Sequence, residues 1–506
     1  MSRRDSLLLA VVLLLGFALR FYRLDYQSAW FDEASSLTIA AEPLPVVALI
    51  AAEGSIDSNP PLYHYLLHGL FTSFGYGVFQ ARFFSLVCGT AAIALLYLLG
   101  AALFDSTAGL AAAFLLAISQ LGVVYSQEAR AYELALLLTV TAAWLFVRAL
   151  GMRDGIAWFG FVLASTAVAY AHYYAVLGPI TLAAFALLFR KRYPIPMAWW
   201  MGGAALAFAL YLPWLIFGIP GALSFHFKVG AEQLPTVSAH WFSLPSAIGV
   251  FNNAKWSIFS RGTKLLIYCL GLLLFTLPTL YAWRAASKDA ELHETGMRPR
   301  DGVFLLTALT WSPVIAILLL SMRTGVYSLR YLVFCTAPYY ALAAYGLLRI
   351  PKPPLKVAAL ALIAILSLAS LYPIYFMPWK EDNRDALGYY ASHRKPTDAV
   401  IFLPPNKWIV DDSHYWTVYH RDDPLPNTTN LRQVLAQPGS YPVVWIVWDR
   451  TWWLNLGHVA AACDGGLRDL SATHVLADDR KYFGAETMLY RLKPELQAAT
   501  SSVRRQ

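Results

Sequence analysis

Charged residues are scarce in this sequence. Only 14% of its 506 residues are Asp, Glu, Lys or Arg, whereas 58% are hydrophobic and the mean hydropathy is +0.49. Soluble globular domains carry about 25% charged residues. This composition excludes an ordinary soluble protein and indicates that most of the chain lies in lipid.

Cysteine and the common catalytic motifs are also scarce. Of the four cysteines, Cys88, Cys269 and Cys335 lie in apolar runs, and Cys463 is alone in the polar C-terminal part. A disulfide within that part is therefore excluded. The sequence contains no CxxC, no HExxH and no glycine-rich phosphate loop, which argues against redox, zinc-peptidase and P-loop nucleotide chemistry.

Apolar runs near the length needed to cross a bilayer recur through the first three quarters of the chain. The predicted spans are 6–22, 80–103, 108–125, 131–150, 155–172, 174–190, 197–218, 263–284, 302–321, 329–349 and 355–376. We therefore predict a mainly α, polytopic membrane protein with about eleven transmembrane helices. Because no small-residue cleavage site follows the first run, we expect it to be an uncleaved helix.

The basic residues indicate the orientation of these spans. With a cytoplasmic N-terminus, the inside loops carry Arg3, Arg4, Arg148, Arg153, Arg190, Lys191, Arg192, Arg284, Lys288, Arg298, Arg300, Arg349, Lys352 and Lys356. An odd number of spans then places the C-terminus outside. The net charge of +8 follows from this topology and from attraction to the anionic inner leaflet, and no nucleic-acid motif accompanies it.

The polar C-terminal part predicts a separate domain. Residues 1–376 form the membrane domain, 377–494 an extracytoplasmic domain and 495–506 a frayed tail. Within the outer domain, 381–394 has a helical pattern, and β-like runs occupy 398–403, 442–448 and 488–491. Strands that alternate with helices predict a small α/β fold.

Two long outer segments interrupt the membrane domain, at 23–79 and 222–262. Loops of this length are usually functional. In the first, Pro60-Pro61 breaks the chain, and the apolar stretch 65–74 is too short to span. We expect that stretch to be an amphipathic helix in the membrane interface, so that the whole 23–79 loop lies on the membrane.

Polar side chains gather at the predicted outer ends of the spans. Asp32 and Glu33 form a carboxylate pair on the loop after the first span, where burial of charge is costly unless it serves a function. The alternative is a solvated loop that caps the next segment. Glu128 with Arg130 could simply be an ion pair, and His172 could be a hydrogen-bonded interfacial residue.

Arginines at the outer ends have two interpretations. One is snorkelling, in which the guanidinium of a helix end reaches the interface. The other is a site for an anionic lipid headgroup, because the planar guanidinium can donate two hydrogen bonds to a phosphate. The residues concerned are Arg20, Arg23, Arg82, Arg130, Arg323 and Arg330.

Several short motifs occur in a familiar order and spacing. They are Trp30-Phe31-Asp32-Glu33, Pro60-Pro61-Leu62-Tyr63, Arg82-Phe83-Phe84-Ser85 and Tyr125-Ser126-Gln127-Glu128-Ala129-Arg130-Ala131-Tyr132. The chain thereby resembles the GT-C superfamily of membrane glycosyltransferases, most nearly the bacterial branch of protein O-mannosyltransferases, lipid A aminoarabinose transferases and lipopolysaccharide-core galacturonosyltransferases. The resemblance is clearest over 20–190 and is supported by His172-Tyr173-Tyr174 and Arg330-Tyr331. Asn59 departs from it, since many relatives have His there.

The resemblance implies an inverting transfer of a sugar from a polyprenyl-phosphate carrier to a hydroxyl of a lipid, glycan or protein, at the outer face of the bacterial inner membrane. It places Asp32 as general base and Glu33 as the residue that orients or helps to bind the acceptor. Arg82, Arg130, Arg330, Arg323 and Lys255 are the implied ligands of the donor phosphate. Tyr63, His64, Glu128, His172 and Tyr173 are the implied substrate contacts. Because arginines can neutralise the leaving phosphate, we expect neither an obligatory metal nor a cofactor.

Two other classes of protein fit the composition. A secondary transporter or lipid-sugar flippase is also polytopic and rich in aromatics, but its charges usually lie near the bilayer midplane within repeated halves. A membrane receptor would account for the outer domain and leave the carboxylate pair unexplained. One outer cavity lined by the polar residues would favour the transferase, and a central pathway would favour transport.

Overall fold

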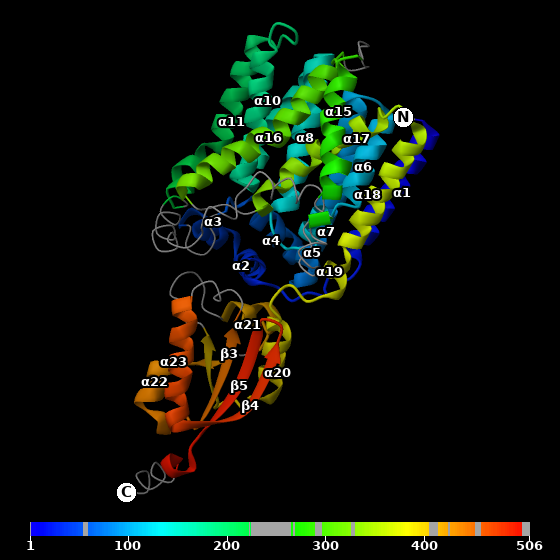
Figure 1. The fold of residues 1–506 in the computed structure, drawn as a ribbon. Helices are drawn as coiled ribbons and strands as arrows, with labels where there is room; N and C mark the ends of the chain where they lie inside the picture. Colours follow the sequence, from blue (N-terminus) through cyan, green and yellow to red (C-terminus); the bar gives the residue numbers. More distant parts are fainter. Residues whose placement is uncertain are drawn as a thin grey trace. The chain divides into compact units, whose positions relative to one another are not determined.

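The computed structural model (Figure 1) describes residues 2–53, 59–221, 223, 265–266, 269–288, 296–324, 329–403, 413–423, 426–450 and 457–497. The chain divides into two compact units. The first comprises residues 1–24, 42–75 and 79–376, and it holds the long apolar helices. The second comprises 25–41, 76–78 and 377–506, so a short part of the N-terminal region belongs with the C-terminal domain.

The apolar helices of the first unit follow the predicted spans. They are α1 (Arg3–Phe21), α5 (Val78–Leu103), α6 (Ser106–Ala117), α7 (Gln120–Ser126), α8 (Tyr132–Met152), α9 (Gly155–Ala171), α10 (Leu177–Leu188), α11 (Met197–Phe217), α15 (Leu277–Ala286), α16 (Pro299–Thr324), α17 (Thr336–Leu348) and α18 (Pro353–Ser370). Among the described residues, seven helices are long and apolar enough to cross a membrane, or eight if one bent pair is a single span. α9 and α10 are shorter, and α1 carries four charged residues, so the expected count of eleven stays a prediction.

The predicted span 108–125 is broken in the structure. α6 and α7 meet at an angle of 59°. Ser119 begins α7, because its hydroxyl accepts a hydrogen bond from the Gly122 amide. The buried guanidinium of Arg20 donates to the carbonyls of Leu116 and Ala117, at 3.1 and 2.9 Å. The Leu116 carbonyl also accepts a 3.3 Å bond from the Ser119 amide, so Arg20 adds to the hydrogen bonding of backbone oxygens at the break, where the regular helical pattern stops.

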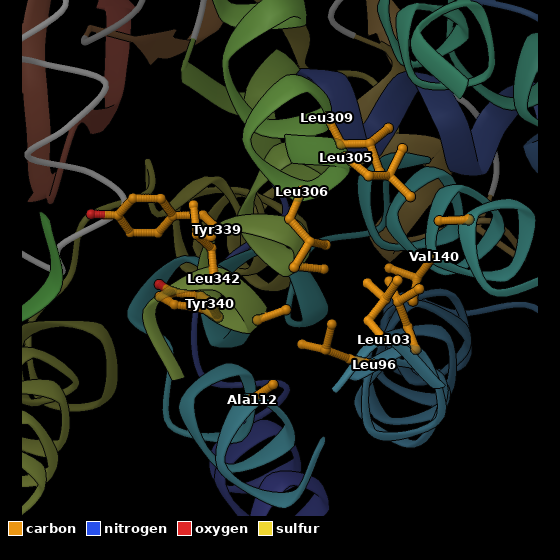
Figure 2. Close-up of a cluster of buried hydrophobic side chains, with 14 of the residues drawn as sticks. Leu96, Leu103, Ala112, Val140, Leu305, Leu306, Leu309, Tyr339, Tyr340 and Leu342 are labelled. Atoms are coloured by element: carbon orange, nitrogen blue, oxygen red, sulfur yellow. The ribbon is translucent and has the colours of Figure 1, made fainter. Parts of the chain in front are cut away.

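A continuous apolar core joins the helices of the first unit. Figure 2 shows side chains from α5, α6, α8, α16 and α17 directed toward one another. The labelled members are Leu96, Leu103, Ala112, Val140, Leu305, Leu306, Leu309, Tyr339, Tyr340 and Leu342. Apolar burial gives no hydrophobic driving force between helices in lipid, so close packing holds these helices together.

Gly346 allows one of the closest helix contacts in this core. A β-carbon at this position of α17 would overlap the carbonyl oxygen of Pro278 in α15. We therefore expect Gly346→Ala to lower stability by about 1–3 kcal/mol through overpacking. Thermal unfolding of purified protein in detergent measures this effect. Gly202→Ala on α11, where nothing lies within 4 Å, is the matched control and should not lower the unfolding temperature, because alanine is the better helix former.

The segment 23–79 contains more helix than its sequence indicates. α4 (Leu62–Phe74) begins directly after Pro60-Pro61 and buries Tyr63, Leu67 and Phe71 on one face, which confirms the short helix expected there. Two further helices, α2 (Phe31–Ala41) and α3 (Leu44–Glu53), replace the predicted loop. The second long segment, 222–262, lies outside the described residues except for Leu223.

The second unit contains a five-stranded sheet in the order β2-β1-β3-β5-β4. Its elements are α20 (Asn383–His393), β1 (Ala399–Leu403), α21 (Ser413–Tyr419), β2 (Asn427–Thr428), α22 (Leu431–Ala436), β3 (Val443–Asp449), α23 (Gly457–Thr473), β4 (His474–Tyr482) and β5 (Ala485–Leu492). β1 pairs in parallel with β2 and β3, and β5 pairs antiparallel with β3 and β4. Helix α20 and strands β1, β3 and β5 lie where the sequence predicted a helix and strands, whereas α21, β2, α22, α23 and β4 were not predicted.

Helices cover both faces of this sheet. Val434 of α22 and Leu470 of α23 pack with Ile446 on one face. Tyr390 of α20 packs against Trp445 on the other, with ring centroids 5.6 Å apart. A strand buried on both faces has no polar side to alternate with, which explains the continuous apolar run of β3.

Candidate active site

The carboxylate pair lies in the first turn of α2 rather than on a loop. The predicted loop is therefore wrong, because the run from Phe31 to Ala41 forms a regular helix. The Asp32 side chain is half-buried, and Glu33 is fully buried. The partial positive charge at a helix N-terminus favours an anionic side chain at both positions.

Glu33 is paired inside the second unit. Its Oε2 accepts a hydrogen bond from Nζ of Lys380 at 2.7 Å, and both side chains are almost completely shielded from solvent. The same oxygen lies 3.4 Å from the backbone amide of Trp30. Lys380 was not singled out in the sequence, although it is the first basic residue after the last predicted span.

Five aromatic residues of the first unit pack together, and we call them the aromatic cluster. They are Tyr125, Tyr132, His172, Tyr174 and Tyr331. The His172 ring centroid is 5.7 Å from that of Tyr132 and 5.5 Å from that of Tyr331. Tyr174 stacks on Tyr331 at 4.9 Å. Three separate turns of the chain meet here: the α7–α8 turn, the α9–α10 turn and the start of the 3-10 helix η4 (Leu329–Cys335).

Charged residues border the aromatic cluster. The half-buried Arg330 places its guanidinium carbon 5.6 Å from the Tyr331 ring centroid. Both Arg330 and Glu128 lie within electrostatic range of Tyr125. The structure thus brings together Glu128, His172 and Arg330, which are far apart in the sequence.

A second set of predicted residues converges on Ser85 of α5. The Tyr63 hydroxyl lies 3.4 Å from Ser85 Oγ, and that Oγ donates to the backbone carbonyl of Arg130 at 3.4 Å. His64 follows Tyr63 on α4 and is buried. This arrangement attaches α4 to the α7–α8 turn that carries Glu128 and Arg130.

The remaining predicted residues have separate positions. Arg82 is fully buried, and its NH1 donates to the backbone carbonyl of Leu24 at 3.1 Å. Tyr173 is half-buried in the turn after α9. Lys255 and the side chain of Arg323 lie outside the described residues. Among the parts of the chain that the structure describes, no group of three His, Cys, Asp or Glu side chains could hold a metal ion.

Two buried ionisable side chains, Arg20 of α1 and Glu133 of α8, were not recognised in the sequence as neighbours. Arg20 Nε donates to Ser126 Oγ at 3.0 Å. A β-carbon on Gly89 would lie 2.8 Å from Glu133 Oε2 and 3.2 Å from Arg20 Nε, so both groups crowd the same glycine. Gln127 donates to the carbonyls of Arg20 and Tyr22. Arg20 therefore supports the turn that carries Glu128 and Arg130, which is a different role from snorkelling.

Comparison with known proteins identifies the fold. Residues 58–217 match the family model described as dolichyl-phosphate-mannose-protein mannosyltransferase. The structure of ArnT from Cupriavidus metallidurans in the apo state matches with a TM-score of 0.56 and 13% identity, over 96% of this chain and 97% of that one. The chain has the fold of the GT-C membrane glycosyltransferases. The resemblance that the sequence motifs indicated is therefore confirmed.

Other GT-C structures match over almost the whole chain. ArnT from Cupriavidus metallidurans bound to undecaprenyl phosphate gives a TM-score of 0.55 at 13% identity, again covering 96% of this chain and 97% of that chain. The archaeal oligosaccharyltransferase AglB from Archaeoglobus fulgidus, in complex with an inhibitory peptide and a dolichol-phosphate, gives 0.51 at 12% identity and covers 97% of this chain and 74% of that one. No curated protein matches the sequence.

Proposed function

We propose that this protein is an inverting glycosyltransferase that moves a sugar from a polyprenyl-phosphate-sugar donor to a hydroxyl of a lipid, glycan or protein acceptor. The observation that carries the proposal is the GT-C fold shared with an ArnT that binds undecaprenyl phosphate and an AglB that binds a dolichol-phosphate. The half-buried carboxylate of Asp32 adds the general base that such a transfer requires.

Asp32 would act on the acceptor. Its carboxylate takes the proton of the acceptor hydroxyl, while the hydroxyl oxygen forms a bond to the anomeric carbon of the sugar. The bond between that carbon and the phosphate oxygen breaks, and its electron pair leaves with the lipid phosphate. Attack from the face opposite the leaving phosphate inverts the anomeric carbon. The position of Asp32 in the first turn of α2 favours the ionised form that a base needs.

Arg330 and Arg130 would stabilise the leaving phosphate. The guanidinium of Arg330 is held on the ring of Tyr331, which limits its freedom before a ligand binds. Arg130 belongs to the turn that Arg20, Gln127 and Ser85 support. Positive groups fixed in advance stabilise a developing negative charge more than flexible ones do. Tyr63, His172 and Tyr173 remain proposed hydrogen-bond donors, and Arg82, Arg323 and Lys255 remain proposed phosphate ligands.

The proposed topology places the C-terminal domain outside the bacterial inner membrane and the N-terminus in the cytoplasm. Lys395 is exposed in that domain, whereas a strand position such as Val400 is fully buried and would not react. In a Cys269→Ser background, Lys395→Cys should react with a membrane-impermeant maleimide in cells with a permeable outer membrane. Lys191→Cys, at an exposed position in a predicted inner loop, should react only after lysis. The reverse pattern would contradict this topology.

A direct assay tests the activity. Purified protein in proteoliposomes is incubated with radiolabelled polyprenyl-phosphate sugars and a membrane extract from cells that lack the gene, and the labelled products are identified. The proposal predicts label on a hydroxyl-bearing acceptor together with release of free polyprenyl phosphate. Movement of intact donor across the bilayer without release of that phosphate would identify a flippase instead.

A further inference from the structure

Hydrogen bonds from residues 377–384 and from Tyr419 hold the segment that leads to Asp32. We propose that Lys380, paired with Glu33, is the positioning residue through which the C-terminal domain sets the direction of the Asp32 carboxylate. This inference rests on the proposed function, in which Asp32 is the base. It gives the domain a role in the transfer reaction itself.

The segment before α2 has no regular structure, so its position depends on side-chain contacts. Gln27 donates to the carbonyl of Met377 at 2.8 Å and accepts from the amide of Trp379 at 3.2 Å. Ser28 accepts from the amide of Arg384 at 3.1 Å. These bonds join the chain before α2 to the link after α19 (Tyr372–Phe376) and to the first turn of α20.

Two further side chains of the domain bind backbone groups of the same segment. The Arg384 guanidinium donates to the carbonyls of Asp25 and Tyr26, at 2.9 and 3.1 Å. The hydroxyl of Tyr419, at the end of α21, accepts from the Ala29 amide at 2.5 Å. The groups that Arg384 and Tyr419 contact belong to the backbone, so these bonds hold the path of the chain into α2.

The Lys380–Glu33 pair fixes a side chain of α2 itself. Neighbouring residues of an α-helix point about 100° apart around its axis, since a turn takes about 3.6 residues. When Glu33 points inward to Lys380, Asp32 is directed to the side, and its half-buried state agrees with this. A turn of α2 about its axis would separate Glu33 from Lys380, and an unpaired charge in a buried site is strongly unfavourable.

The test compares four variants of the full-length protein, one of which combines Lys380→Met with Glu33→Gln. Lys380→Met removes the ammonium and keeps the length of the side chain. Lys380→Arg keeps the charge. Lys395→Met is the matched control, because Lys395 is an exposed lysine of the same domain. Each is assayed for kcat and for KM of the donor, and by hydrogen exchange of peptides that cover 25–41 and β3.

For Lys380→Met we expect kcat to fall roughly 10²-fold with little change in KM, because a misplaced base slows the chemical step and leaves donor binding intact. Exchange in 25–41 should rise about tenfold while β3 stays protected, since the contact is local to α2. Lys380→Arg should restore most of both properties. Adding Glu33→Gln to Lys380→Met removes the unpaired buried anion and should return the exchange in 25–41 toward the wild-type rate.

Several results would overturn the inference. One is wild-type exchange and kcat in Lys380→Met. Another is a rise in β3 exchange equal to that of 25–41, which would show that the pair maintains the domain rather than the direction of Asp32. An equal loss in Lys395→Met would also contradict it. If the wild-type protein transfers no sugar, the proposed function fails, and the exchange measurements alone still decide whether Lys380 holds α2.

Discussion

Replacing Asp32 by asparagine is expected to lower the rate of sugar transfer roughly 10²–10⁴-fold, the range typical of a lost general base. Asparagine keeps the size of the side chain and most of its hydrogen bonding, but it does not accept the proton of the acceptor hydroxyl. The loss of negative charge in the first turn of α2 costs only about 0.3–1 kcal/mol of stability, so the fold should persist. Turnover of a labelled donor by purified variants measures the effect.

The control for this experiment must be chosen from the structure. Glu33→Gln would leave Lys380 buried opposite a neutral group, so its effect would combine a change in position with a change in chemistry. Asp25→Asn is the better match, because Asp25 belongs to the same unit and its side chain is 57% exposed. We expect Asp25→Asn to keep nearly full activity. Full activity in Asp32→Asn would disprove the proposed mechanism.

Replacing Arg330 by alanine is expected to weaken donor binding or stabilisation of the leaving phosphate by about 2–4 kcal/mol, which is roughly a 30- to 700-fold loss in kcat/KM. The physical reason is that a phosphate charge without a fixed cation is costly at a site shielded from water. Arg330 is preferred to Arg82 for this test. Arg82 is fully buried and donates a hydrogen bond to the Leu24 carbonyl, so its replacement would also disturb folding.

Arg23 provides the matched control. Like Arg330 it is half-buried and lies over an aromatic ring, with its guanidinium carbon 5.3 Å from the Phe376 centroid. Arg23→Ala should therefore lose a comparable cation–π contact without loss of donor affinity. Equal donor affinity and transfer rates in Arg330→Ala and wild type would show that Arg330 only anchors a helix end.

Much of the fold follows from local pattern. Runs of apolar residues predict membrane helices because backbone groups in lipid must be satisfied within the segment. The break in the span 108–125 was not predicted, because its carbonyls accept hydrogen bonds from Arg20 of a distant helix, and no pattern within the span indicates such a partner. The sequence of α2 contains few charges and no clear helical periodicity, so it was not predicted as a helix. Its helical state follows from packing within the second unit.

The sequence by itself determined the membrane class, several strands of the C-terminal domain and the motif residues, because hydrophobic run length, strand composition and short motifs are local properties. Only the tertiary structure decided which of these residues meet. It placed His172, Glu128 and Arg330 around one aromatic cluster. It also joined Glu33 to Lys380 across 347 positions of the chain. Contacts between residues so distant depend on how whole helices and strands pack, and no local pattern in the sequence encodes that packing.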